Sequence, residues 1–224
     1  FPGVALHATA GPDLQPSGLV VWAVKPQTFR EAALAAGPHL GGALHLSVAA
    51  GITSDSMATW LGTQRIVRAM PNTPALVGLG MTGLFSRDGA SAADRALVET
   101  VVKTTGALVW VATERDLDAV TALSGSGPAY VFYFLEAMRD AGANMGLAPE
   151  VALQLAVGTF VGASTLAQRS TEPPQVLRER VTSKGGTTYA ALTSMEAAGM
   201  KASFEAALQA AQRRAEELGR EFGA

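Results

Sequence analysis

Up to about Val111, short apolar runs of strand length alternate with stretches whose apolar residues have helical spacing. The apolar runs are Leu19–Val24, Ala43–Val48, Arg65–Met70 and Ala107–Val111. The stretches with helical spacing are Thr28–Ala36, Ser54–Leu61 and Ala92–Thr104. Strands that alternate with helices are typical of a parallel sheet with helices on both faces. We therefore predict an α/β domain of the doubly wound type over residues 1–113.

From Asp116 onward, strand patterns are absent from the sequence and prolines mark the starts of helical stretches. Proline is tolerated in the first turn of a helix, where its missing N–H has no intrahelical partner. The predicted helices are Pro128–Ala143, Pro149–Gln168, Pro174–Thr182, Thr187–Ala198 and Lys201–Phe222. The last of these is amphipathic, which predicts an outer helix. We predict an all-helical domain over residues 114–224.

Two of these helices are too apolar for an isolated small domain. Tyr130–Met138 is apolar nearly all round, and a partner subunit is the simplest cover for such a surface. Val151–Gln168 has no charge but is short for a membrane span and is diluted by polar residues. We interpret it as a helix buried in the protein or at a subunit interface, and we expect the chain to self-associate at least as a dimer.

Composition narrows the classes of function. Apolar residues make up 48% of the chain and charged residues 16%, with a formal net charge of −2 and no basic run. This balance argues against nucleic acid or a membrane as a partner. Cysteine is absent and the three histidines have no ligand spacing, so no metal site is predicted. A chain without cysteine suits a reducing compartment, and we expect a cytoplasmic protein.

The stretch GLGMTG, from Gly78 to Gly83, has the glycine spacing of a dinucleotide-binding turn. Such a turn must follow a strand and open a helix directly. Here the two prolines of MPNTPALV argue against a central strand before it, and Asp88 and Gly89 interrupt any helix after it. We therefore predict that Gly78, Gly80 and Gly83 are bends that pass close to their neighbours and that they hold no phosphates.

Two other stretches lie where elements begin or end. AVKP, Ala23 to Pro26, follows the first strand at the edge where α/β sheets bind ligands, although an ordinary β–α turn fits it equally well. SGSGPAY, Ser124 to Tyr130, opens a helix, where plain capping by serine is the simpler alternative. A serine-hydrolase elbow is excluded there, because it needs glycine two residues before Ser126 and Ser124 occupies that position.

SKGGTT, Ser183 to Thr188, places two glycines before two threonines that open a helix. Glycine lets a ligand approach the backbone, and free N–H groups at a helix start bind anions. One hydroxyl is enough for capping, so the pair favours an anion site. The sequence offers no paired carboxylates at useful spacing, which indicates a reaction whose difficult step belongs to a cofactor, such as hydride transfer.

Five motifs in order along the chain resemble those of pyrroline-5-carboxylate reductases: AVKP, SVAAG, MPNTPALVGLGMTGL, LSGSGPAY and VTSKGGTT. The resemblance runs from about Leu19 to the C-terminus. It implies reduction of 1-pyrroline-5-carboxylate to L-proline by NADPH or NADH, the last step of proline biosynthesis. It also implies a Rossmann domain followed by a helical domain that interlocks two subunits, and dimers that can assemble into a ring, a decamer.

The resemblance also implies roles for individual residues. Those that would bind the cofactor are Ala23, Val24, Lys25, Pro26, Ala49, Ala50 and Gly51. Those that would bind the substrate are Ser183, Gly185, Gly186, Thr187, Thr188 and, in the pocket wall, Ser126. Thr188 would be catalytic through a hydrogen bond to the ring nitrogen.

The chain departs from the family pattern in two places. Lys184 stands where proline is more common, and the first β–α–β unit of the Rossmann domain, with its glycine-rich turn, is missing upstream of AVKP. The alternatives are a 3-hydroxyacid or 6-phosphogluconate type of dehydrogenase and a non-catalytic helical oligomerisation fragment. Those dehydrogenases use a lysine of the helical domain, and here Lys184 and Lys201 are the only lysines after Lys103.

Overall fold

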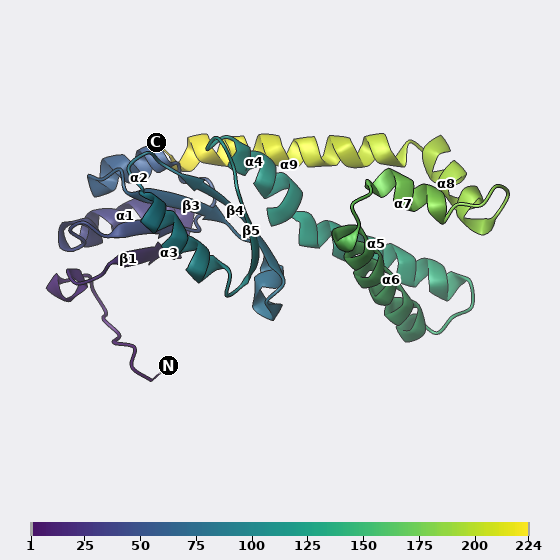
Figure 1. The fold of residues 1–224 in the computed structure, drawn as a ribbon, viewed down its shortest axis with the longest axis horizontal. Coiled ribbons are helices and arrows are strands. Elements are labelled where there is room, and N and C mark those ends of the chain that lie inside the picture. Colours follow the sequence, from purple (N-terminus) through teal and green to yellow (C-terminus); the bar gives the residue numbers. More distant parts are fainter. Residues whose placement is uncertain (1, 224) are drawn as a thin grey trace. The chain divides into compact units, whose positions relative to one another are not determined.

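In the computed structural model, which describes residues 2–223, five strands form one sheet in the order in which they occur along the chain (Figure 1). They are β1 (Leu19–Trp22), β2 (Leu44–Ser47), β3 (Ile66–Met70), β4 (Gly80–Ser86) and β5 (Gly106–Trp110). β1, β2 and β3 are parallel, β4 is antiparallel to β3, and β5 is parallel to β4. The predicted α/β class is confirmed, with one reversal of strand direction inside the sheet.

That reversal occurs in the stretch that contains GLGMTG, and our prediction that its glycines are only bends is wrong. Pro71 and Pro74 lie before the strand, in the connection and in the 3-10 helix Thr73–Val77, so neither interrupts it. Gly78 ends that helix in the left-handed conformation, with φ +73°. Gly80 then begins β4, which includes Gly83.

The predicted close approach of this segment is confirmed. A Cβ at Gly83 would lie 2.7 Å from Cγ1 of Val120, and one at Gly80 would lie 2.8 Å from the carbonyl oxygen of Thr105. A side chain at either position would need the neighbouring element to move. The glycines therefore allow β4 to lie between β3 and β5 with a helix packed directly on it.

Helices cover both faces of the sheet because side chains alternate along each strand. On one face, Trp22 and Ile66 pack with residues of α1 (Pro26–Ala36) and α2 (Ser54–Leu61). On the other face, Leu46 and Val67 pack with residues of α3 (Ala92–Val102). The result is a three-layer α/β arrangement, and it leaves the loops at the strand ends free to carry the site.

The rest of the chain is helical, as predicted. The elements are α4 (Asp116–Val120), α5 (Gly127–Asn144), α6 (Pro149–Arg169), α7 (Pro174–Arg180), α8 (Thr187–Ala197) and α9 (Met200–Phe222). Pro149 and Pro174 stand at the first helical positions, which confirms the reading of those prolines as helix starts. α4 was not predicted, because a five-residue helix is too short to show a period.

By contacts, the chain divides into two compact units. One contains the residues up to Pro128 together with those from Leu208 onward, and the other is Ala129–Ala207. The C-terminal part of α9 therefore belongs to the sheet unit, where Phe222 packs against the core under α1 and α2. The functional boundary that we place after residue 113 stays a prediction.

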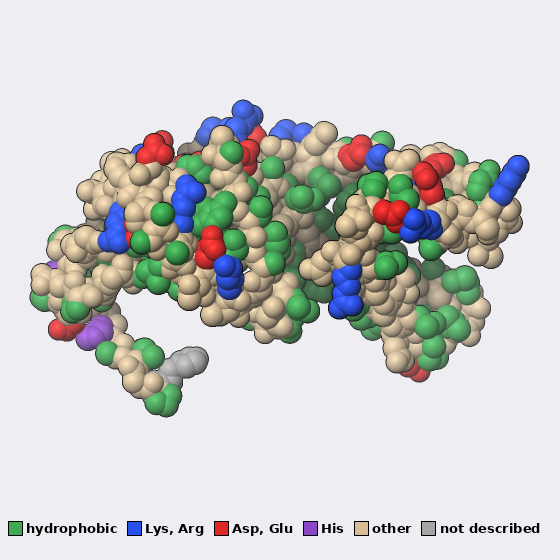
Figure 2. Space-filling model, in the orientation of Figure 1, with side chains coloured by type: hydrophobic (Ala, Val, Ile, Leu, Met, Phe, Trp, Pro, Cys, Tyr) green, Lys and Arg blue, Asp and Glu red, His purple; other side chains and the backbone are tan. Residues whose placement is uncertain are grey.

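In a single chain, α6 leaves most of its apolar surface uncovered. Ala152 and Ala156 are buried, whereas Leu155, Val161 and Leu166 are each more than half exposed. Hydrophobic side chains gather over the part of the view that holds α5 and α6 (Figure 2). Among the described residues, α6 is also the one helix long and apolar enough to cross a membrane by length and composition alone.

Candidate active site

Three loops at the carboxyl ends of parallel strands define the candidate site. Ala23–Pro26 follows β1, Ala49–Thr53 follows β2, and Pro71 and Asn72 follow β3. Because β1, β2 and β3 are parallel, these loops emerge at the same edge of the sheet. Open α/β sheets bind their ligands outside this edge.

The loop after β1 leads straight into α1. Lys25 is the N-cap residue in extended conformation, and Pro26 occupies the first helical position without any side-chain cap on the helix start. Ala23 and Lys25 are exposed. This loop suits an anionic nucleotide, because its small Ala23 leaves room, the start of α1 is uncapped and Lys25 supplies a positive charge.

The loop after β2 is held from both sides. Ala49 is buried and its N–H donates to Oγ of Ser47 at 3.2 Å. Gly51 has φ +74°, and a Cβ on it would lie 3.1 Å from the carbonyl oxygen of Leu218 in α9. Only glycine suits this position, because the conformation is left-handed and the backbone of α9 lies against it.

Glu114, in the connection between β5 and α4, binds the residue at which the loop after β2 ends and α2 begins. Its carboxylate accepts hydrogen bonds from both the N–H and the Oγ of Ser54, the first residue of α2, which is fully buried. It also accepts from Nη1 of Arg68 on β3 at 2.7 Å. Sequence reasoning missed Glu114, because nothing in the local pattern marks a lone carboxylate that contacts a residue 60 positions away.

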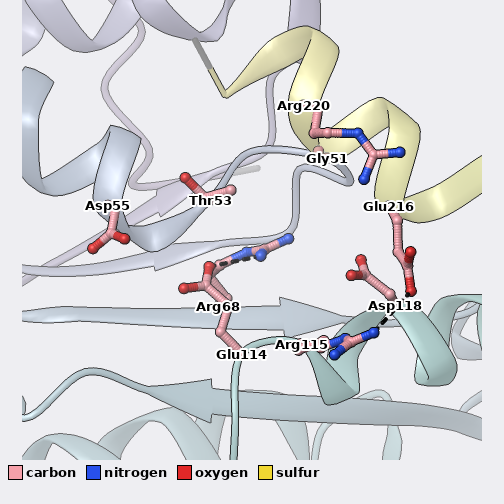
Figure 3. Close-up of a pocket in the computed structure, with 10 residues that line it drawn as sticks. Gly51, Thr53, Asp55, Arg68, Glu114, Arg115, Asp118, Glu216 and Arg220 are labelled. Carbon is pink, nitrogen blue, oxygen red and sulfur yellow. Dashed lines mark hydrogen bonds and ion pairs between the residues drawn. The ribbon is translucent and has the colours of Figure 1, made fainter.

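A crevice of about 420 Å³ opens beside Gly51, between the loop after β2, α4 and α9 (Figure 3). Both acidic and basic side chains line the crevice: Asp55, Arg68, Glu114, Arg115, Asp118, Glu216 and Arg220. Arg115 is 3.9 Å from Glu216, and burial raises the pKa of Asp118 from its ordinary value. With Arg68 already paired, the crevice has no excess of positive charge for a polyphosphate. Of the predicted site residues, it contains only Gly51.

At the end of β3, Asn72 connects two further segments. Its Nδ2 donates to the carbonyl oxygen of Ser124 at 3.2 Å and to Oγ of Ser124 at 3.3 Å, and its Oδ1 accepts from the N–H of Met81 at 2.8 Å. Ser124 lies in a π-helical turn, Thr121–Gly125, that ends at Ser126. The predicted Ser126 is therefore held near the same sheet edge as the predicted cofactor loops.

The segment from Ser183 to Thr188 belongs to the other compact unit. It forms a turn in which the N–H of Gly186 donates to the carbonyl oxygen of Ser183 at 3.0 Å, and Gly185 has φ +75°. α8 begins at Thr187 with Gly186 as its N-cap and no side-chain cap. Its first N–H groups therefore have no side-chain cap and can bind an anion, and Ser183, Lys184 and Thr187 are exposed.

Comparison with known proteins identifies the family. A family model described as "Pyrroline-5-carboxylate reductase dimerisation" matches residues 114–218. A pyrroline-5-carboxylate reductase of Pseudomonas aeruginosa is 44% identical over 207 residues, which cover 92% of this chain and 76% of that protein. The chain belongs to the pyrroline-5-carboxylate reductase family. A relative of the same name from Arabidopsis thaliana is 39% identical over 217 residues, 96% of this chain and 78% of its own length.

Solved structures of the pyrroline-5-carboxylate reductase family have the same fold. The protein from Coxiella burnetii superposes with a TM-score of 0.86 at 38% identity, over 91% of this chain and 77% of that one. The Plasmodium falciparum protein, solved with NADP bound, superposes with a TM-score of 0.83 at 32% identity, over 89% and 79%. The family resemblance inferred from the five motifs is thereby confirmed, and so is self-association through a dimerisation domain.

Proposed function

We propose that this chain catalyses the reduction of 1-pyrroline-5-carboxylate to L-proline with NADPH or NADH, as the oxidoreductase of the last step of proline biosynthesis. The observation that carries the proposal is the family match: relatives named pyrroline-5-carboxylate reductase are 35–44% identical over most of the chain. The solved relative from Plasmodium falciparum has NADP bound, which supports the choice of cofactor.

The cofactor would lie along the loops after β1 and β2. Ala23, Val24, Lys25 and Pro26 would contact it from the first loop, and Ala49, Ala50 and Gly51 from the second. The residues present fit such a group, because the α1 start is uncapped and the exposed Lys25 can attract a phosphate. When bound, the reduced nicotinamide supplies the hydride.

The substrate carboxylate would lie at the start of α8. Gly185 and Gly186 let it approach the backbone, and the N–H groups of the first helical turn, together with Ser183 and Thr187, would hold it. Ser126 would form part of the pocket wall. Holding the carboxylate in place orients the C=N bond, which is how positioning lowers the barrier of a two-reactant step.

Thr188 would act at the ring nitrogen. A hydroxyl within hydrogen-bond distance of that atom polarises the C=N bond and holds the proton that the product amine needs. A protonated imine is already electrophilic, so the chain needs no strong general base. This agrees with the lack of paired carboxylates at useful spacing in the sequence.

The test is an assay of reduced-nicotinamide oxidation, followed by its absorbance, with 1-pyrroline-5-carboxylate as substrate. We expect turnover that requires the imine and yields proline, measured with NADPH and with NADH in parallel. The matched control replaces the imine by proline, which has no C=N bond to reduce. A protein that binds either nucleotide yet oxidises neither in the presence of the imine would contradict the proposal.

Three finer points belong to the same proposal. We infer that dimers assemble further into a ring, a decamer, and that the enzyme works in the cytoplasm, where reduced nicotinamide is regenerated. We also infer that the functional boundary lies after residue 113, with cofactor binding before it and substrate binding and dimerisation after it. The match of the dimerisation model over residues 114–218 supports this division.

A further inference from the structure

We propose that Asn72 is a positioning residue that sets the place of the Ser124–Ser126 turn in the substrate pocket. The inference rests on the proposed function for the chemistry of that pocket, and on the hydrogen bonds of Asn72 for the rest. Asn72 would not touch the reacting atoms. It acts through the turn that carries Ser126.

The side chain of Asn72 bridges two segments that are far apart in the sequence. It is half-buried, and although Asn72 is the N-cap residue of the 3-10 helix Thr73–Val77, its side chain makes no cap bond there. Instead its amide donates to Ser124, 52 residues away, while its carbonyl accepts from the N–H of Met81 in β4. One orientation of the amide satisfies both neighbours, because Ser124 offers a carbonyl acceptor and Met81 an N–H donor.

The turn that Asn72 contacts has an unusual backbone. Residues 121–125 form a π-helical turn, and the N–H of Ser126 donates to the carbonyl oxygen of Thr121 at 2.9 Å. Such single π turns are rare and occur often at functional sites. Gly125 lies against the end of β3, since a Cβ there would come within 2.6 Å of Cε of Met70.

Apart from the buried Ala122, the residues of this turn are only partly covered. Ser124, Gly125 and Ser126 are half-buried, and Leu123 has 68% of its surface exposed. The hydrogen bonds of Asn72 to Ser124 therefore add to the packing of Gly125 and of the buried Ala122 in holding the turn that leads to Ser126. Two residues at the end of β3 contact the turn. Met70 packs against Gly125, and Asn72 donates hydrogen bonds to Ser124.

The decisive variant is Asn72→Asp, which keeps an oxygen for the N–H of Met81 but replaces the donor toward Ser124 with a second acceptor. We expect the KM for 1-pyrroline-5-carboxylate to rise about tenfold, the size of effect of one or two lost hydrogen bonds, while the KM for the cofactor stays within about twofold. Asn144→Asp makes the same chemical change at the exposed end of α5 and serves as the matched control.

A merely structural role would give a different pattern. It would lower the Tm and change both KM values together. Equal KM values in Asn72→Asp and the parent enzyme would overturn the proposal. The double variant with Ser124→Ala adds a check, because the loss should then be smaller than the sum of the single losses.

A second measurement does not need activity. Hydrogen–deuterium exchange at the amides of Ser124, Gly125 and Ser126 should be faster in Asn72→Asp than in the parent protein, and unchanged in Asn144→Asp. Unchanged exchange in Asn72→Asp would overturn the positioning role. If the parent protein shows no turnover, the proposed function fails, whereas the exchange result still decides whether Asn72 holds the turn.

Discussion

At the scale of single residues, two side chains carry separate consequences: Thr188 for the chemistry and His45 for stability. Thr188 is partly buried in the first turn of α8, close to the glycines that leave the helix start open. His45 lies inside the sheet unit, 3% exposed, and its Nδ1 accepts a hydrogen bond from Nε1 of Trp22 at 3.0 Å. The first role depends on the proposed reaction, whereas the second depends only on burial.

Replacing Thr188 with alanine should lower kcat by about a hundredfold, because the hydroxyl that polarises the C=N bond and holds the proton is lost. The dissociation constant of the cofactor should not change. Steady-state kinetics and a cofactor titration measure the two quantities. Thr193→Ala, the same change at an exposed position farther along α8, is the control. Unaltered proline formation in Thr188→Ala would show that the assignment of Thr188 is wrong.

His45 should make the fold sensitive to acid. Burial, with a smaller contribution from the positive charge of Arg65, lowers the pKa of His45 from 6.5 to about 4. In the unfolded chain, His45 binds a proton below about pH 6.5, whereas in the folded chain it does so only below about pH 4. The free energy of unfolding therefore falls as the pH drops from 6.5 to 4. We expect the loss assigned to His45 to reach ~3 kcal/mol at about pH 4.

Urea unfolding at a series of pH values measures this contribution. Carboxyl groups titrate in the same range, so the informative quantity is the difference between the parent protein and His45→Gln, which keeps an acceptor for Trp22 but does not titrate. That variant should lose stability less steeply between pH 6.5 and 4. Parallel curves for the parent and His45→Gln would refute the assignment.

At the scale of elements, β4 is a strand whose first residues lie in a sequence with the glycine spacing of a dinucleotide-binding turn. Its first four residues, GMTG, are part of the stretch that looks like a phosphate-binding turn, and its two glycines allow contacts that no other residue type would. The close packing of β4 on Val120 and beside Thr105 depends on those contacts. The element is therefore sensitive to the smallest added side chain.

We expect Gly83→Ala to destabilise the protein by about 1–3 kcal/mol, because the new methyl group would overlap Cγ1 of Val120 in α4. The backbone of Gly83 is not left-handed, so the cost would come from packing alone. Chemical denaturation measures the change. Gly219→Ala, inside α9 with no atom near the added methyl group, should instead be neutral or gain roughly 0.5–1 kcal/mol. Equal stability of the two variants would contradict this account of β4.

At the scale of the whole molecule, the apolar surfaces of α5 and α6 call for a partner subunit. Phe132 and Tyr133 on α5 are 58% and 70% exposed, and Leu155 on α6 is 58% exposed. Exposed apolar area of this kind marks association surfaces. The family's dimerisation model covers both helices, which makes a second copy of the chain the natural cover.

Leu155→Asp should weaken self-association by at least tenfold, because a carboxylate buried in an apolar interface has no partner. Sedimentation over a range of concentrations measures the mass. Leu34→Asp, at a leucine of α1 that is 54% exposed, is the matched control and should leave the mass unchanged. If Leu155→Asp keeps the mass of the parent protein, α6 does not contribute to the interface at that position.

The sequence by itself determined the types of most elements, the two kinds of architecture and the family. These features depend on local information: the period of apolar residues, prolines at helix starts and five motifs in order. The family resemblance also implied that residues of the loops after β1 and β2 bind one cofactor, and AVKP was predicted at the edge where α/β sheets bind ligands. The roles of the residues in those loops, and of Ser183 to Thr188, stay predictions.

Only the tertiary structure decided which distant residues meet. Residues 80–86 were not predicted as a strand from their sequence. The strand depends on the close approach of Gly83 to Val120 and of Gly80 to Thr105, which only the folded chain shows. Likewise, no local pattern predicts the hydrogen bonds of Asn72 and Glu114 to Ser124 and Ser54, which lie 52 and 60 residues away. A sequence pattern records the period of one element, whereas these contacts depend on how elements far apart in the chain are packed.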